Sequence, residues 1–147
     1  MNVAYFLIPK NEVGFIYDDH TLRQGLEKMK RAGFTAMPVV TRENRYVGTV
    51  SEGDFLWYLI QEQQQEGEGY HTVSIRFVED TLVRDVLGTD RNPPVRITAT
   101  VDQLVDRAMH QNFIPVIDDL GSFIGIVTRK DIIRHFYEKS HTPFTKK

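Results

Sequence analysis

Two aspartates, Asp54 and Asp131, end the same short motif. Each lies three residues after a hydroxyl residue, which itself lies three residues after a glycine. Gly48-Thr49-Val50-Ser51 precedes Asp54, and Gly125-Ile126-Val127-Thr128 precedes Asp131. A hydroxyl and a carboxylate three residues apart, at the turn from a strand to a helix, can donate and accept hydrogen bonds to one ligand. The alternative is that each aspartate is a plain helix cap, since Asp is favoured there whatever the function.

Both motifs belong to an internal repeat. Pro38-Val39-Val40 corresponds to Pro115-Val116-Ile117, and the offset of 77 holds without a gap from Pro38 to Asp54. A period this long exceeds a solenoid unit, whereas 147 residues suit one ordinary domain. The sequence therefore predicts two half-domains that share one core.

Each half is expected to form a strand, a helix, two strands and a second helix. The first half begins with a strand at 13–17 and a helix capped by Thr21, with Gln24 reaching back to it. The second begins with a strand at 95–97 and a helix after Thr100, with two residues fewer before the repeated proline. Asp54 and Asp131 are expected to open the last helix of each half. The predicted fold class is α/β (α+β).

Composition excludes several classes of protein. The formal net charge is −2 and the pI about 6.2, so the chain lacks the basic field of a nucleic-acid-binding protein. There are no cysteines, and the five histidines have no helical spacing suited to a metal. The apolar start, residues 1–10, is too short to span a membrane and is interpreted as an edge segment of a cytoplasmic protein.

The doubled motif resembles a tandem pair of CBS domains, named after cystathionine β-synthase. The resemblance covers nearly the whole chain. It implies two pseudo-twofold-related β-α-β-β-α units packed sheet to sheet. The expected boundaries are residues 1–60 for the first unit, 61–80 for a linker, 81–139 for the second unit and 140–147 for a flexible tail.

The resemblance also implies a non-catalytic regulatory module that binds adenosine-containing ligands in clefts between the two units. Asp54 and Asp131 would accept the ribose hydroxyls, and Ser51 and Thr128 would lie one step further along the ligand. The expected walls around the base are Met37, Pro38, Ile114, Pro115, Val13 and Val95. No cofactor is required for this function.

The two expected sites differ in charge. Arg129 and Lys130 flank Asp131, whereas Glu52 and Gly53 flank Asp54. Arginine can bind a phosphate bidentately and a carboxylate repels it, so the Asp131 site is expected to prefer phosphorylated ligands. The alternative is that these side chains point to solvent. Further positive charge is available from Lys10, Arg91 and Arg96.

Six bulky apolar residues, 55–60, follow Asp54 and surround a helix on all sides. A surface helix buries one stripe, so the other face is expected to meet a second copy in a homodimer. Phe55, Trp57 and Tyr58 would contribute, together with Phe136 and Tyr137 from the second half. The alternative is that an added strand at 73–77 covers the extra face.

The linker is expected to extend the preceding helix and to break at Gly67 and Gly69, acting as a solvated connector or as a ligand-gated element. The function that these observations favour is a sensor of AMP, ADP, ATP, S-adenosylmethionine or cyclic di-AMP that signals to an unidentified regulated protein. The alternative is a dimerising adaptor with degenerate ligand sites. An enzyme is disfavoured because no base, nucleophile or metal cluster stands out.

Overall fold

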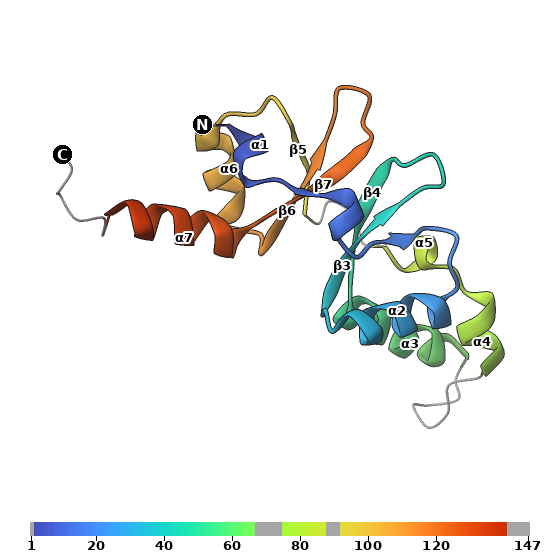
Figure 1. Ribbon diagram of the computed structural model, residues 1–147. Helices are drawn as coiled ribbons and strands as arrows, with labels where there is room; N and C mark the ends of the chain where they lie inside the picture. Colours follow the sequence, from blue (N-terminus) through green and yellow to red (C-terminus); the bar gives the residue numbers. More distant parts are fainter. Residues whose placement is uncertain (1, 67–74, 88–91, 141–147) are drawn as a thin grey trace, which may run out of the picture. The chain divides into compact units, whose positions relative to one another are not determined.

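The computed structural model describes residues 2–66, 75–87 and 92–140, with the side chains of 62–66 and 75–77 excepted. The chain forms two compact units (Figure 1). Unit 1 comprises Met1–Val13 and Asn92–Lys147, and unit 2 comprises Gly14–Arg91.

Unit 2 contains the first repeat. Its sheet has the order β2-β3-β4, in which β2 is parallel to β3 and β4 is antiparallel to it. The elements are β2 (Ile16–Tyr17), α2 (Leu22–Ala32), β3 (Ala36–Val40), β4 (Tyr46–Ser51), α3 (Glu52–Glu66), α4 (Ile75–Asp80) and α5 (Val83–Val86). The core lies between the sheet and the helices and includes Ile16, Leu22, Met37 and Phe55.

Unit 1 contains the second repeat. Its sheet has the order β1-β7-β6-β5, in which β5 is parallel to β6 and the other pairs are antiparallel. The elements are α1 (Val3–Phe6), β1 (Ile8–Pro9), a 3-10 helix η1 (Lys10–Glu12), β5 (Val95–Arg96), α6 (Val101–Ala108), β6 (Phe113–Ile117), β7 (Phe123–Thr128) and α7 (Arg129–Ser140). Its core includes Val3, Phe6, Leu104 and Ile114.

The structure confirms the predicted repeat. β3 and β6 begin and end 77 residues apart, as do β4 and β7, and both pairs shift register at the same place, between Val39 and Val40 and between Val116 and Ile117. The strand-helix-strand-strand-helix order is present in both units, so the α/β fold class is confirmed. The prediction that the two units pack sheet to sheet stays a prediction.

The predicted caps of the first helices are also confirmed. The Thr21 hydroxyl accepts a hydrogen bond from the Gln24 backbone N–H at 3.1 Å, and the Gln24 side chain accepts one from the Thr21 N–H at 2.9 Å. Thr100 and Gln103 form the same reciprocal pair with the same two distances. The α6 helix has 8 residues against 11 in α2, which accounts for the shorter spacing in the second half.

Each unit is completed by the segment that precedes the other repeat. Val3 and Phe6 of α1 are buried in the core of unit 1, and Val83 and Val86 of α5 are buried in the core of unit 2. The compact units therefore differ from the expected boundaries. Residues 1–13 belong to the unit of the second repeat, and residues 81–91 belong to the unit of the first repeat. The signal was present in the sequence, since Val-x-x-φ-Leu, with φ apolar, occurs at 3–7 and at 83–87.

The N-terminal segment packs closely on β7, at the edge of its sheet as predicted. Ile8 and Pro9 pair with Ile126 and Gly125. Gly125 has a φ of 156°, and a Cβ atom there would overlap the Ile8 carbonyl and the Leu7 side chain. Glycine is required at this position because the backbone of β1 takes the space of a side chain.

One expected strand is wrong and another is shorter than expected. Residues 75–77 are helical, in α4, while Val73 and Ser74 lie outside the described residues. The strand expected at 13–17 consists of Ile16–Tyr17 only, and Val13 ends η1 within unit 1. The expected helical extension of the linker is confirmed as far as Glu66. The expected breaks at Gly67 and Gly69 and the tail residues 141–147 lie outside the described residues.

Candidate functional site

The Thr128–Asp131 turn joins β7 to α7. The Thr128 hydroxyl accepts a hydrogen bond from the Asp131 backbone N–H at 3.1 Å, so Thr128 caps the helix and Asp131 is its third residue. The expectation that the aspartate opens the helix is therefore wrong by two residues. Asp131 thus lies in the first turn of α7, where a negative charge is favoured.

The equivalent turn in unit 2 has a closed hydrogen-bond cycle. The Asp54 N–H donates to the Ser51 hydroxyl at 3.1 Å, and the Ser51 N–H donates to the Asp54 carboxylate at 2.9 Å. This is a capping box, in which the carboxylate serves the helix. Asp54 therefore fits the simpler interpretation as a capping residue better than Asp131 does.

The Asp131 carboxylate has a different partner. Arg134, one turn further along α7, places Nη1 3.5 Å from its Oδ1, and the Asp131 side chain is 32% exposed. An exposed pair of this length contributes little to stability, so a ligand can replace it at small cost. Sequence reasoning missed Arg134, although the i, i+3 spacing from Asp131 and the exchange for Trp57 in the first repeat signalled it.

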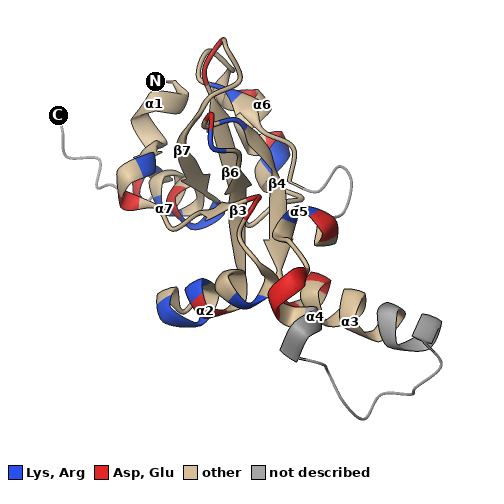
Figure 2. Cartoon of the chain, turned by 90° about the vertical axis from the view of Figure 1, so that its right-hand side faces the viewer, with Lys and Arg blue, Asp and Glu red and all other residues tan. Residues whose placement is uncertain are grey.

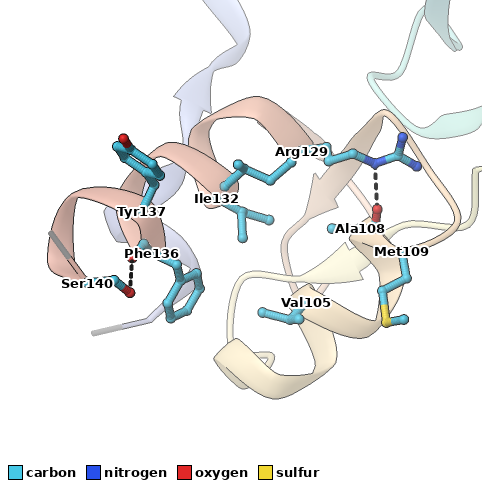
Figure 3. Close-up of a pocket in the computed structure, with 9 residues that line it drawn as sticks. Val105, Ala108, Met109, Arg129, Ile132, Phe136, Tyr137 and Ser140 are labelled. Atoms are coloured by element: carbon cyan, nitrogen blue, oxygen red, sulfur yellow. Dashed lines mark hydrogen bonds between the residues drawn. The ribbon is translucent and has the colours of Figure 1, made fainter.

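Arg129 is held inside unit 1. Its Nε donates to the Ala108 carbonyl at 2.6 Å (Figure 3). Its Nη1 donates to the Asn112 side chain at 2.8 Å. The guanidinium thus satisfies the carbonyl at the end of α6, as a cation at a helix C-terminus commonly does. Two of the five N–H donors of the guanidinium are used in these contacts, and the expectation that Arg129 binds phosphate stays a prediction.

A concave surface of about 590 Å³ lies beside the Thr128–Asp131 turn. It is lined by Asn112, Arg129, Lys130, Ile133, Arg134 and Tyr137. Lys130 is exposed, and three of the six lining residues are cations. The residues at the same positions of the first repeat are Thr35, Glu52, Gly53, Leu56, Trp57 and Ile60, none of which is basic. The charge difference expected from the sequence is therefore present around this turn.

The expected apolar walls lie mostly inside the cores. Met37 and Ile114 have no exposed surface and pack among the residues that face the helices. The expectation that Met37 and Ile114 wall the base stays a prediction. Pro38 and Pro115 are buried at the neighbouring positions of the same strands, where side chains point to the other face of the sheet.

Val13 and Val95 do not hold equivalent positions in the two repeats. Val95 pairs with Val116 on β6, and its equivalent in the first repeat is Ile16, which pairs with Val39. Thr128 of β7 pairs with Phe113 of β6, and Phe113 lies three residues before Val116 on β6. Val95 and the Thr128–Asp131 turn therefore lie at different levels of the sheet in unit 1.

Apolar side chains remain exposed on α7 and α3. In unit 1, a groove of about 600 Å³ lies between α6 and α7 (Figure 3). Ile133 and Tyr137, which line it, are 59% and 61% exposed. In unit 2, Leu56 and Trp57 are 60% and 63% exposed. Phe55 is only 1% exposed, so its expected role at a dimer interface is wrong: it fills the core of its own unit.

Five described ionisable groups of unit 2 have perturbed pKa values, and Tyr46 and His20 are two of them. Burial raises the pKa of Tyr46 to about 12, although its hydroxyl lies 2.8 Å from that of Thr49, a hydrogen bond that acts in the opposite direction. Burial lowers the pKa of His20, with smaller contributions from Lys28 and Arg42. Neither group lies at the Ser51–Asp54 turn, and both belong to the packing of the sheet and its loops.

Within residues 2–66, 75–87 and 92–140, no three His, Asp or Glu side chains are grouped so as to hold a metal ion. The same part of the chain has no helix with the length and apolar character needed to cross a bilayer.

Two repeats with one strand-helix-strand-strand-helix order, each with a hydroxyl and a carboxylate at the last turn, define a tandem-repeat α/β protein. The chain belongs to the CBS domain family, whose sequence model matches residues 7–61 and 83–138. The resemblance drawn from the doubled motif is thereby confirmed.

Similar proteins agree with this assignment. A Methanocaldococcus jannaschii protein of uncharacterised function is 28% identical over 119 residues, which is 78% of this chain and 40% of that protein, so the chain spans less than half of this relative. The crystal structure of CbpB in complex with c-di-AMP is 27% identical, with a TM-score of 0.82 over 96% of this chain and 87% of that chain. The structure of CBSX2 in complex with AMP is 22% identical, with a TM-score of 0.73 over 95% and 98% of the two chains.

Proposed function

We propose that this protein is a non-catalytic regulatory module that binds an adenosine-containing ligand at the Thr128–Asp131 turn of unit 1. The observation that carries the proposal is the difference between the two aspartates. Asp54 completes a capping box, whereas Asp131 is one-third exposed beside a weak pair with Arg134. A carboxylate that the helix does not need is available to a ligand.

The residues of this turn fit the parts of such a ligand. The Asp131 carboxylate can accept hydrogen bonds from both ribose hydroxyls, and such charge-assisted bonds are the stronger kind. Lys130 and Arg134 line the concave surface next to it and supply positive charge for phosphate oxygens. Thr128 fixes the start of α7 and thereby the position of Asp131.

Cyclic di-AMP is the first ligand to test. CbpB, a CBS domain protein that binds c-di-AMP, matches this chain at 27% identity over almost its full length. AMP is the second, because CBSX2, which has the same fold, binds it. Both ligands carry the ribose and phosphate groups for which the turn is suited.

Ligand-induced stabilisation tests this proposal. A ligand present at about 100 times its dissociation constant stabilises the fold by about 2.7 kcal/mol, which raises the melting temperature by several degrees. Asp131→Asn should remove most of this shift for cyclic di-AMP or AMP. The matched control is Asp54→Asn, which keeps a side chain able to accept the Ser51 hydrogen bond and should retain the shift.

Two outcomes would contradict the proposal. If Asp54→Asn abolishes the shift while Asp131→Asn preserves it, the ligand binds at the other turn. If no adenosine compound shifts the melting temperature and mass spectrometry finds none released from the purified native protein, the chain is a dimerising adaptor with degenerate sites.

We also propose that the protein forms a homodimer through α3 and α7. Leu56 and Trp57 of α3 in unit 2, and Ile133 and Tyr137 of α7 in unit 1, expose large apolar side chains, and exposed apolar surface commonly marks a protein interface. Ile133→Glu with Leu56→Glu should shift sedimentation from dimer to monomer without changing the far-UV circular dichroism. A wild-type chain that sediments as a monomer at about 50 μM would contradict this part.

The regulated partner is a separate protein in this proposal. Ligand control requires that the ligand bind one conformation of the module more tightly than another. A ligand with equal affinity for both conformations does not shift the equilibrium between them. A pull-down from cell extract, compared with and without cyclic di-AMP, would identify a partner whose binding depends on the ligand.

A further inference from the structure

A second polar concavity lies on the β5–α6 side of unit 1. Its volume is about 590 Å³, and it is lined by Pro94, Val95, Arg96, Thr98, Ala99, Gln103, Asp106 and Arg107. Neither Thr128 nor Asp131 belongs to it. The proposed adenosine site therefore does not account for this concavity.

The same place in unit 2 is filled by aromatic rings. Phe15 and Tyr17 meet edge to face with centroids 5.5 Å apart, and Tyr17 meets His20 in the same way at 5.5 Å. The Lys28 ammonium lies 4.9 Å from the centre of the Phe15 ring. Unit 2 thus contains a cluster of edge-to-face rings with a cation over one of them, and both kinds of contact are favourable.

The second repeat has a cation at the position of Lys28 and no aromatic rings at the positions of Phe15, Tyr17 and His20. Ile16 and Val95 hold equivalent strand positions, which gives an offset of 79 for this part of the repeat. By this offset, Pro94, Arg96 and Ala99 take the positions of Phe15, Tyr17 and His20. Arg107 takes the position of Lys28. Three residues that line the concavity therefore stand at the positions where unit 2 has aromatic side chains.

The charges around the concavity are mixed, as the blue and red segments of α6 show (Figure 2). Arg96 lies 3.7 Å from Asp119, and both side chains are mostly exposed, so this pair is weak. Arg107 is half-buried and makes no ion pair with the residues that the structure describes. Gln103 is already engaged with the Thr100 N–H, and Asp106 is the acidic residue of the lining.

We propose that this concavity binds a small planar aromatic anion, a ring that carries one carboxylate or phosphate group. The ring lies under the Arg107 guanidinium, as Phe15 lies under Lys28, and the anionic group meets Arg96. Unit 2 supplies its own ring at this place, so the site exists in unit 1 alone. This site is distinct from the proposed adenosine site at the Thr128–Asp131 turn.

Amide chemical-shift mapping tests the proposal. Benzoate and phenyl phosphate are the probes, and cyclohexanecarboxylate and inorganic phosphate are the controls that lack an aromatic ring. The probes, at up to about 10 mM, should shift the amides of residues 95–107. The controls should not shift them to a comparable extent. Whichever probe binds more tightly identifies the acid group.

Two variants make the test specific. Pro94→Phe with Ala99→His restores two of the rings of unit 2 and should abolish binding, with circular dichroism to confirm the fold. Arg107→Ala changes a half-buried surface residue and should weaken binding by about tenfold. Asp106→Asn should strengthen binding, because it removes a repelling carboxylate.

The proposal is overturned if neither probe shifts the amides of residues 95–107. It is also overturned if cyclohexanecarboxylate binds as well as benzoate, or if Arg107→Ala binds the probes as well as the wild-type chain does. Probe-induced shifts confined to residues 128–134 would assign the probes to the Thr128–Asp131 turn and would equally overturn this second site.

Discussion

The Ser51–Asp54 and Thr128–Asp131 turns share one backbone plan and differ in what surrounds the carboxylate. In both, the first helical N–H donates to the preceding loop: Glu52 to the Thr35 carbonyl at 3.0 Å and Arg129 to the Asn112 carbonyl at 2.8 Å. In both, the hydroxyl caps the helix. Only the carboxylates differ, because Asp54 completes a capping box and Asp131 faces Arg134.

The difference shows how a duplicated fold can divide its tasks. The hydrogen bonds that position the turn are needed in both units, so they are the same in both. The surrounding charges are not needed for folding, and they differ: Lys130 and Arg134 in one unit, Gly53 and Trp57 in the other. The concavity beside β5 shows the same kind of difference. Aromatic rings pack against one another in unit 2, whereas the corresponding residues of unit 1 line an open concavity.

The largest expected effect separates the core from the exposed helix surface. Phe55→Ala removes a side chain that is 1% exposed in unit 2 and should cost about 4 kcal/mol in the free energy of unfolding. Phe136→Ala removes one that is 39% exposed in unit 1 and should cost about 1 kcal/mol. Urea unfolding of both variants measures this difference, and equal costs would contradict the assignment of Phe136 to the surface.

The next effect compares the two strand glycines. Gly125→Ala should destabilise the chain by roughly 3 kcal/mol, because the new Cβ would overlap the Ile8 carbonyl and displace β1. Gly48→Ala places its Cβ 3.4 Å from a flexible Leu87 methyl group and should cost about 1 kcal/mol. Thermal unfolding ranks the two variants. A larger loss for Gly48→Ala would show that β1 does not pack on β7.

A third prediction concerns the charges beside Asp131. Lys130→Glu should weaken the binding of a phosphorylated adenosine ligand by about tenfold, because it replaces a cation beside the Asp131 turn with a carboxylate that repels phosphate oxygens. The matched change in the first repeat, Gly53→Lys, should leave the affinity unchanged. Isothermal titration with cyclic di-AMP measures both. Equal affinities for Lys130→Glu and the wild-type chain would remove Lys130 from the site.

The smallest predicted effect is a dependence of stability on pH in unit 2. Burial lowers the pKa of His20 below its usual value of 6.5, Lys28 and Arg42 lower it further, and Asp19 opposes them. The unfolded chain therefore binds a proton more readily than the folded one, and stability should fall as the pH drops through 6.5. His20→Gln should flatten this dependence in urea unfolding between pH 7.5 and 5.5, values chosen to span about one unit on either side of the unfolded pKa. An unchanged slope would assign the dependence to other groups.

The sequence by itself determined the repeat, the fold class and the capped helices. The caps follow from Thr-x-x-Gln motifs of four neighbouring residues, and the repeat follows from comparing two segments of the chain at a gapless offset of 77. The difference in charge between Arg129-Lys130 and Glu52-Gly53 was readable from the same comparison.

Only the tertiary structure decided which unit each flanking segment completes and which side chains remain available to a ligand. Val3–Leu7 and Val83–Leu87 precede one repeat and pack on the other, and no local signal specifies a contact between such distant residues. The sequence suggests Arg129 as a phosphate ligand, and the fold engages two of its donors with Ala108 and Asn112. Hydrogen-bond partners and burial arise from packing between elements, so a residue's type and spacing suggest its chemistry, and the fold decides whether that chemistry is free to act.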